Sequence, residues 1–302
     1  MGKIFAKGIV LVFLNLFCWG VCYVQAQDDL LSDLEALDPT AEKPTVGEVF
    51  NGTRLVNTHS TEMLSKKHLE FRVAHRFGEV NQGLSRLYGL DFAGAIQLSF
   101  DYAVEDWLTL GLGRTNSDQV IHGLFKFRLM EQRPASAGFA PVNIVWVSMM
   151  NATHREERFA NEFRNGSNRL EYFNQLLLSW KVSNRLSALA STYFHRRNLV
   201  AFSQDNPNTL GGTLGGRFKF NSVFSINAEL LSPLTHASAS AERGGAVPLS
   251  LGLDIETGGH VFQVFFTTSA FVNEAQVHTH SAGSVLDGGY RLGFNVSRVF
   301  GL

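Results

Sequence analysis

The final thirteen residues of the chain, 290–302, alternate between apolar and polar side chains, with Arg298 as the one break in the apolar row. One row carries Tyr290, Leu292, Phe294, Val296, Phe300 and Leu302, and the other carries Arg291, Gly293, Asn295 and Ser297. A period of two is that of an extended strand with one apolar face and one polar face. The chain must therefore fold so that this amphipathic strand is paired, with its apolar face in an apolar environment and its polar face in a polar one.

About eleven earlier segments, beginning at His68, show the same alternation. One of them places Ile96, Leu98, Phe100 and Tyr102 opposite Gln97, Ser99 and Asp101. Tight turns alternate with mostly longer polar links, although 130–141 is long where a short turn is expected. The pattern predicts an all-β fold, a transmembrane antiparallel up-and-down β-barrel of about 12 strands with both chain ends on one side.

The N-terminus predicts a signal peptide over 1–26. Lys3 and Lys7 precede an apolar run, and Val24-Gln25-Ala26 fits a cleavage site. A membrane anchor helix is the alternative, but the run is short for a span. Both cysteines lie in this segment, so the exported chain would hold no disulfide or thiolate site. We expect an acidic periplasmic lead-in and possible lumen plug over 27–67, and the barrel over 68–302.

The alternation alone fits both a soluble β-sandwich and a membrane barrel. In a soluble β-sandwich the apolar row faces inward, whereas in a membrane barrel it faces lipid. The export signal, the alternating connection lengths and the aromatic residues near strand ends favour the outer membrane of a Gram-negative bacterium. The expected partners are then outer-membrane lipids, lipopolysaccharide and, during biogenesis, the barrel-assembly machinery. A formal net charge of -1 argues against nucleic acid.

Several short motifs resemble a known family. They are 50–57 (FNGTRLVN), His59-Ser60 and 75–78 (HRFG), followed by 88–91 (YGLD), 106–109 (DWLT), 111–114 (GLGR) and 123–128 (GLFKFR). Together they resemble the DUF5777 β-barrel proteins of Bacteroidetes over roughly residues 48 to 302. The resemblance implies an outer-membrane barrel. Because that family is named for its unknown function, it implies no catalytic residue.

The polar row of the predicted strands carries about as many cations as anions. We expect the lumen to be lined by Arg72, Arg76, Asp101, Lys126, Arg128, Lys181, Arg217, Lys219, Glu229, Asp254, Glu256 and Arg291. These charges could pair with one another and hold the barrel in shape, or they could line a pore that selects small solutes. Barrels of eight strands are filled and those of 16 to 18 hold an aqueous channel, so strand number leaves both open.

The polar segment 50–62 comes just before the first predicted strand. It could lie in the lumen as a plug, in which Arg54, Asn57, His59 and Glu62 meet lumen charges, or it could be a solvated tether. We favour the plug, because Arg54 and Glu62 could form ion pairs there.

Catalysis and metal binding have weak signals. His236 and Ser238 have the spacing of an outer-membrane phospholipase pair, but they fall in a predicted outer loop without fixed geometry. His278 and His280 could form part of a metal site, yet no third ligand is evident and a solvated loop is favoured. We therefore expect no catalytic residue, no cofactor and no metal.

The function predicted from these features is a narrow or gated porin-like conduit for a small polar solute. The rival is a filled structural or interaction barrel that does not conduct. In either case the terminal strand should meet the strand at 68–77 and close the barrel. That pairing is expected to bring Arg291 near Glu70 or Arg72.

Overall fold

The computed structural model describes residues 45–92, 94–134, 138, 140–200, 205–235, 247–280, 283 and 286–302. The expected signal peptide (1–26), most of the lead-in (27–44), and His236 and Ser238 lie outside the described residues.

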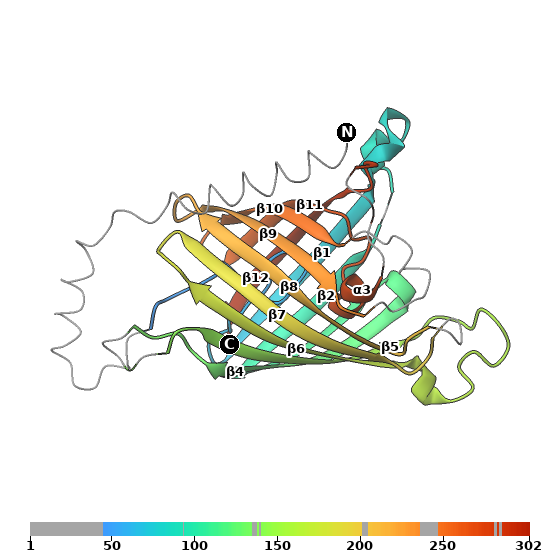
Figure 1. Ribbon diagram of the computed structural model, residues 1–302, viewed down its shortest axis with the longest axis horizontal. Helices are drawn as coiled ribbons and strands as arrows, with labels where there is room; N and C mark the ends of the chain where they lie inside the picture. The colour runs from blue at the N-terminus through green and yellow to red at the C-terminus, as the bar shows by residue number, and fades with distance from the viewer. Residues whose placement is uncertain are drawn as a thin grey trace. The chain divides into compact units, whose positions relative to one another are not determined.

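Twelve antiparallel strands form one closed barrel, in which each strand pairs with its sequence neighbours and β1 pairs with β12 (Figure 1). The strands are β1 (His68–Glu79), β2 (Ile96–Glu105), β3 (Leu108–Thr115), β4 (Val120–Met130), β5 (Asn143–Thr153), β6 (Leu170–Lys181), β7 (Leu186–Arg197), β8 (Asn208–Lys219), β9 (Phe224–Pro233), β10 (Leu249–Glu256), β11 (His260–Thr267) and β12 (Arg291–Gly301). The predicted fold class and strand number are confirmed.

The outer face of the barrel wall is apolar and its inner face is polar, the reverse of the arrangement in a soluble protein. On β2 the apolar Leu98 and Phe100 are 44% and 51% exposed, whereas the polar Ser99 and Asp101 are 1% and 3% exposed. On the other strands the apolar row likewise faces outward, and the inward row is mostly polar, apart from a group of buried apolar residues centred on β5. An outward apolar surface on every strand requires lipid around the barrel, which excludes the soluble sandwich. Among the described residues, no helix is long and apolar enough to span a membrane.

The connections fall into two classes, one at each end of the barrel. At the end where β1 begins and β12 ends, called here the terminal end, tight turns span 106–107, 182–185, 220–223 and 257–259, with the expected long exception at 131–142. The opposite end, called here the loop end, carries the connections 80–95, 154–169, 198–207, 234–248 and 268–290, and one short link at 116–119. Short elements in these connections are η1 (Val80–Gln82), η2 (Leu84–Gly89), η3 (Ser117–Gln119), η5 (Gly166–Arg169) and α3 (Glu274–Thr279).

The closing register corrects one expectation. His68 lies opposite Gly301 at the terminal end, and antiparallel pairing then carries Arg291 to the loop end, opposite Glu79. Arg291 donates from Nη2 to Glu79 Oε1 at 2.5 Å. The expected proximity to Glu70 or Arg72 is therefore wrong, because those residues lie at the other end of β1, opposite Val299 and Ser297.

Candidate functional site

The twelve charged residues expected to line the lumen all fall on the inward row of their strands. Seven of them are deeply buried: Arg72, Arg76, Asp101, Lys126, Arg217, Glu229 and Asp254. The other five are partly exposed, namely Arg128, Lys181, Lys219 and Glu256 near the terminal end and Arg291 at the loop end. The wall thus presents its most buried charges in the middle of the barrel, where they need partners.

The partners come chiefly from residues 45–64, called here the inner segment, which is mostly buried inside the barrel from Val49 onward. Its central part, Thr53–Ser60, is called here the inner hairpin. The hairpin is closed by a bridge between Arg54 and His59, and by bonds from Leu55 N to Thr58 O (2.9 Å) and from Ser60 N to Thr53 O (3.0 Å). Leu55 and His59 are fully buried, and Arg54 is 4% exposed. The segment considered either as a lumen plug or as a solvated tether is therefore enclosed by the wall.

The tip of the inner hairpin is held by one carboxylate, that of Glu229 on β9. Its two oxygens accept the backbone N–H groups of Val56 (3.3 Å), Asn57 (2.9 Å) and Thr58 (3.2 Å). They also accept the Asn57 amide at 2.5 Å, and the other side of that amide accepts from Arg76 Nη2 at 2.8 Å. Hydrogen bonds to a charged acceptor are roughly twice as strong as neutral ones. Four donors on one buried carboxylate therefore make Glu229 the main polar attachment of the hairpin.

A second attachment lies where the segment crosses β4. Lys126 Nζ donates to the backbone oxygen of Glu62 at 2.6 Å. The Glu62 carboxylate accepts the backbone N–H groups of Val49 (2.7 Å) and Phe50 (3.0 Å) and so closes the segment on itself. Burial raises the pKa of Glu62, and these two backbone donors oppose the rise.

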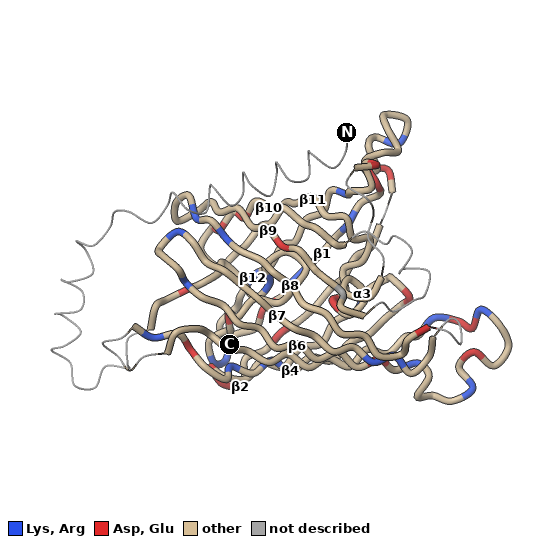
Figure 2. The backbone as a smooth tube through the Cα atoms, in the orientation of Figure 1, with Lys and Arg blue, Asp and Glu red and all other residues tan. Residues whose placement is uncertain are grey.

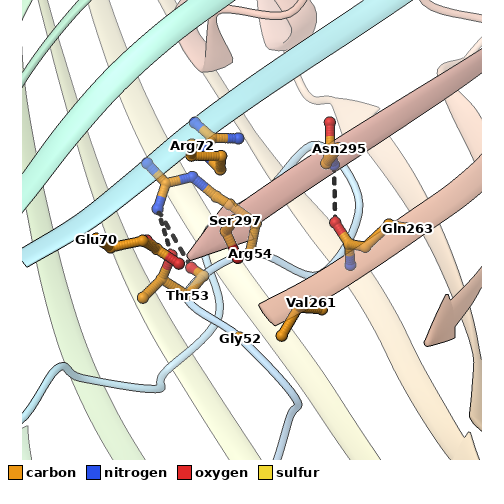
Figure 3. A pocket seen from close by; sticks show the side chains of 9 residues that line it. All are labelled: Gly52, Thr53, Arg54, Glu70, Arg72, Val261, Gln263, Asn295 and Ser297. Atoms are coloured by element: carbon orange, nitrogen blue, oxygen red, sulfur yellow. Dashed lines mark hydrogen bonds between the residues drawn. The ribbon is translucent and has the colours of Figure 1, made fainter. Parts of the chain in front are cut away.

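Beside β1, the base of the hairpin encloses a small polar cavity (Figure 3). Thr53 Oγ1 donates to Glu70 Oε2 at 2.5 Å, and Arg54 Nη2 lies 3.7 Å from Asp101 Oδ2. The cavity measures about 10 Å³ and is lined by Thr53, Arg54, Glu70 and Arg72, together with residues of β11 and β12. That volume holds about one water molecule, so little free space remains on this side of the lumen.

The opposite side of the lumen is apolar. Val49, Phe50 and Leu55 pack into one cluster with inward side chains of β4 to β7, including Val145, Val147, Met149, Phe173, Leu177, Leu189 and Tyr193. The wall makes room for Leu55 at Gly215, where an added Cβ would collide with the leucine side chain. This packing explains why both faces of β5 are apolar: one meets lipid and the other meets the inner segment.

The connection between β11 and β12, called here the α3 connection (Thr268–His280), also lies inside the barrel. Val272, Asn273, Ala275, Val277 and His278 are each at most 3% exposed. The expectation of a solvated loop is therefore wrong for His278, whereas His280 is exposed. His278 donates from Nδ1 to the Glu274 backbone oxygen (2.8 Å), so its Nε2 is left to accept from Thr213 Oγ1 on β8 (3.1 Å). Burial lowers the pKa of His278 to about 4 and keeps the ring neutral.

Glu274 joins the α3 connection to the inner hairpin. Its Oε2 lies 2.5 Å from His59 Nε2, and its Oε1 lies 3.6 Å from Arg54 Nε. Burial, with a further contribution from Arg54, lowers the pKa of His59 well below its usual value. Within the described residues, the close approach of His59 to Glu274 is a polar contact without hydrogen-bond geometry. Glu274, which has no evident anchor in the sequence, is thus bound to two residues some 215 positions earlier in the chain.

Comparison with known proteins identifies the family. The family model described as "Membrane bound beta barrel domain (DUF5777)" matches residues 50–300. The chain belongs to this family. A search of curated proteins finds no match. Among solved structures, the NanC porin (10% identity, TM-score 0.45) covers 78% of this chain and 99% of its own. The KdgM porin (8% identity, TM-score 0.46) covers 77% of this chain and 99% of its own. The COG4313 outer membrane channel from Pseudomonas putida F1 (14% identity, TM-score 0.46) covers 80% of this chain and 98% of its own.

The loop end of this DUF5777 barrel holds a larger cavity, of about 110 Å³. Its lining combines cations and anions: Arg155, Arg158, Arg169 and Arg197 with Asp118 and Glu171, next to Gln276 and His280 of the α3 connection. Asp118 pairs with both Arg155 (3.6 Å) and Arg158 (2.7 Å). Among the described residues, no group of three or more His, Cys, Asp or Glu side chains could hold a metal ion.

The α3 connection is the functional element that sequence reasoning missed in this DUF5777 chain. Its alternation is irregular, and two histidines beside polar residues look like a solvated link. Val272, Ala275 and Val277 lie three and two positions apart, which is not the spacing of one helical face. The sequence therefore gives no periodic signal for this element, and its burial depends on the lumen that the closed barrel encloses.

Proposed function

We propose that this membrane barrel is a gated conduit for a small polar solute in the outer membrane of a Gram-negative bacterium of the Bacteroidetes, with the inner hairpin as the gate. One observation carries the proposal: buried polar groups of the wall, Glu229, Lys126 and Arg76 among them, find partners in a segment that, within the described residues, is continuous with a wall strand only through β1. Glu229 and Lys126 bind backbone atoms of that segment. When the hairpin leaves, these groups would line a hydrated passage instead, as the lumen of a channel-forming barrel requires.

The geometry also explains why strand number alone does not distinguish a filled barrel from an open channel. A barrel of this size encloses more space than its own inward side chains fill, because a whole hairpin fits within it. The polar cavity at the base of the hairpin holds about one water molecule, which supports a closed resting state. Opening therefore needs displacement of the segment and not a change of the wall.

The test is planar-bilayer conductance of the refolded barrel in two matched deletions. Removing residues 27–62 takes away the lead-in and most of the inner segment, whereas removing 27–44 takes away the lead-in alone. We expect steady conductance from the first deletion, and low conductance from the second and from the full exported chain. A 27–62 deletion that still shows heat-modifiable electrophoretic mobility, and is therefore folded, but does not conduct would overturn the proposal.

A filled barrel that serves as a structural or interaction protein is the second candidate. It is favoured by the α3 connection, which has several residues buried in the lumen toward the loop end and is continuous with wall strands on both sides. It predicts no conductance in either deletion. We assign no catalytic step to the protein, and unchanged lipid hydrolysis in Ser238→Ala would agree with that.

In either case we propose the same surroundings. The outward apolar rows would contact outer-membrane lipids and lipopolysaccharide, and the barrel-assembly machinery would act on the chain during biogenesis. No contact with nucleic acid is proposed.

A further inference from the structure

The connection between β1 and β2 carries an unusual concentration of exposed apolar side chains. Within the described part of this connection, called here the β1–β2 loop (Val80–Phe92), Leu84 is 73% exposed, Tyr88 51% and Leu87 48%. Leu90 and Phe92 are also exposed. Scattered apolar residues on a surface are ordinary, but a contiguous group within nine positions marks an interaction surface.

The loop is built to hold these side chains outward. Leu87 and Tyr88 have φ angles of 45° and 53°, in the left-handed region that bulky residues rarely adopt. Backbone bonds from Tyr88 N to Gly83 O (2.8 Å) and from Leu90 N to Leu87 O (3.1 Å) fix the turns around them. Such strain persists where surrounding contacts impose it, and it clusters at sites of binding.

The loop is attached to the barrel at two points. Val80 N donates to Tyr290 O (2.9 Å), and Asn81 N donates to Gly288 O (3.3 Å) in the connection before β12. Leu286, which is 92% exposed, stands two residues before the second contact. The other attachment is to the end of β1, where the absence of a side chain at Gly78 permits close approach to the backbone of Gly89. These attachments give the surface a fixed position at the loop end (Figure 1, cyan).

The exposed apolar residues continue into the lipid-facing wall. After Phe92, the outward row of β2 carries on with Ile96, Leu98 and Phe100, each at least 37% exposed. Arg86 lies over the Phe92 ring at 5.2 Å from its centroid, so a cation stands beside the apolar group. Apolar and aromatic side chains with a neighbouring cation suit the boundary between lipid headgroups and acyl chains. The β5–β6 connection at the same end is instead crowded with charge (Figure 2).

We propose that the β1–β2 loop is a membrane-surface anchor, whose apolar side chains enter the headgroup–acyl boundary of the lipid leaflet at the loop end. The surface would fix the height and tilt of the barrel on the side where the first and last strands meet. The proposal is independent of conduction, since the loop takes no part in the contacts that hold the inner hairpin.

The test uses fluorescence quenching in lipid nanodiscs. In a full chain with Cys18→Ser and Cys22→Ser, a single Ser85→Cys is labelled with an environment-sensitive dye. We expect a blue-shifted emission and a loss of fluorescence when the nanodisc contains lipids spin-labelled near the headgroup. The same dye at Arg164→Cys, on the exposed charged β5–β6 connection, should show neither effect.

A triple variant, Leu84→Asp with Leu87→Asp and Leu90→Asp, should abolish the quenching at Ser85→Cys while the barrel keeps its heat-modifiable mobility. Phe159→Asp, which changes an isolated exposed apolar residue elsewhere at the loop end, should leave it intact. Emission typical of water and no quenching at Ser85→Cys would overturn the proposal. So would disulfide cross-linking between Ser85→Cys chains without quenching, which would assign the surface to a second copy.

Discussion

Two segments fill the lumen of this barrel, and they are held in different ways. The inner hairpin hangs from the wall by directed polar bonds, above all the four donors on Glu229. The α3 connection contributes Val272, Ala275 and Val277 to apolar packing and continues into β11 on one side and β12 on the other. The hairpin is held by many non-covalent contacts that can break, whereas the α3 connection is joined covalently to wall strands on both sides.

The difference decides which segment can open a passage. A segment continuous with wall strands at both ends can shift only within its loop. Within the described residues, the hairpin is continuous with a wall strand only through β1, so it can be withdrawn toward the terminal end once its hydrogen bonds to the wall break. Glu274 is the point where the two meet, because it binds both Arg54 and His59. The α3 connection thus acts as a stop against which the hairpin rests.

The largest effect is expected for Glu229→Ala. Loss of this carboxylate leaves three backbone N–H groups and one amide of the hairpin without their charged acceptor. Each hydrogen bond to a charged group contributes about 1.5–3 kcal/mol, so even a net loss of about 3 kcal/mol raises the ratio of open to closed states about 100-fold. Open probability in planar bilayers measures this change.

Glu256→Gln is the matched control for Glu229→Ala. Glu256 lies on the inward row of the neighbouring strand β10, nearer the terminal end. Its substitution should leave open probability close to that of the unaltered chain. Equal effects of the two substitutions would show that lumen charge in general, and not the attachment of the hairpin, controls conduction.

Gly215→Leu tests the apolar packing of the inner hairpin against the wall. A leucine there must occupy the space of Leu55, and overpacking of this kind costs about 1–3 kcal/mol. We expect an increase in open probability of about tenfold or more, with the α3 connection unmoved. Gly123→Leu, placed where an added Cβ meets open space, is the control, and an equal rise in that variant would refute the steric explanation.

Glu274→Gln tests whether the two segments move together. Arg54 retains Asp101 at 3.7 Å, so we expect a smaller loss, of about 1–2 kcal/mol. Thiol labelling of Val56→Cys in the hairpin and Val277→Cys in the α3 connection separates the two. Faster labelling of Val56→Cys alone supports a hairpin that moves by itself, whereas equal acceleration at both sites would show one coupled gate.

The sequence predicted the wall better than its contents, for a physical reason. The period of two is local, so it reveals strands and their two faces, and residues such as Leu98 and Ser99 fall on the expected sides. Contacts inside the lumen are not local. Asn57 meets Glu229 across 172 positions, and no spacing rule connects them.

The two errors show the same limit. Alternation placed Arg291 on the inward row correctly, but its height along the barrel depends on the closing register between the first and last strands. His278 was read as solvated because its burial depends on a cavity that only the closed barrel creates. Local patterns therefore predict which way a side chain faces, and the closed barrel determines what it meets.

The smallest expected effect is on pH dependence, and it concerns the contact between the two segments. His278 faces Thr213 of the wall and Thr58 of the hairpin, at 3.1 Å and 3.4 Å from Nε2. Burial outweighs Glu274 and lowers the pKa of His278 from 6.5 to about 4. The closed state then binds fewer protons than an open, hydrated one, so closure is fully stable above about pH 6.5 and is lost progressively as the pH falls toward 4.

The corresponding measurement is open probability between pH 7.5 and 5, which should rise as the pH falls, by at most about tenfold per pH unit for this group. His278→Gln keeps one donor and one acceptor but cannot titrate, so the rise should shrink. His154→Gln, at a more exposed position of the β5–β6 connection, should leave the profile unchanged. An unaltered pH profile in His278→Gln would show that another group titrates. His59, whose pKa is also lowered by burial, would then be the candidate, and His59→Gln should flatten the profile.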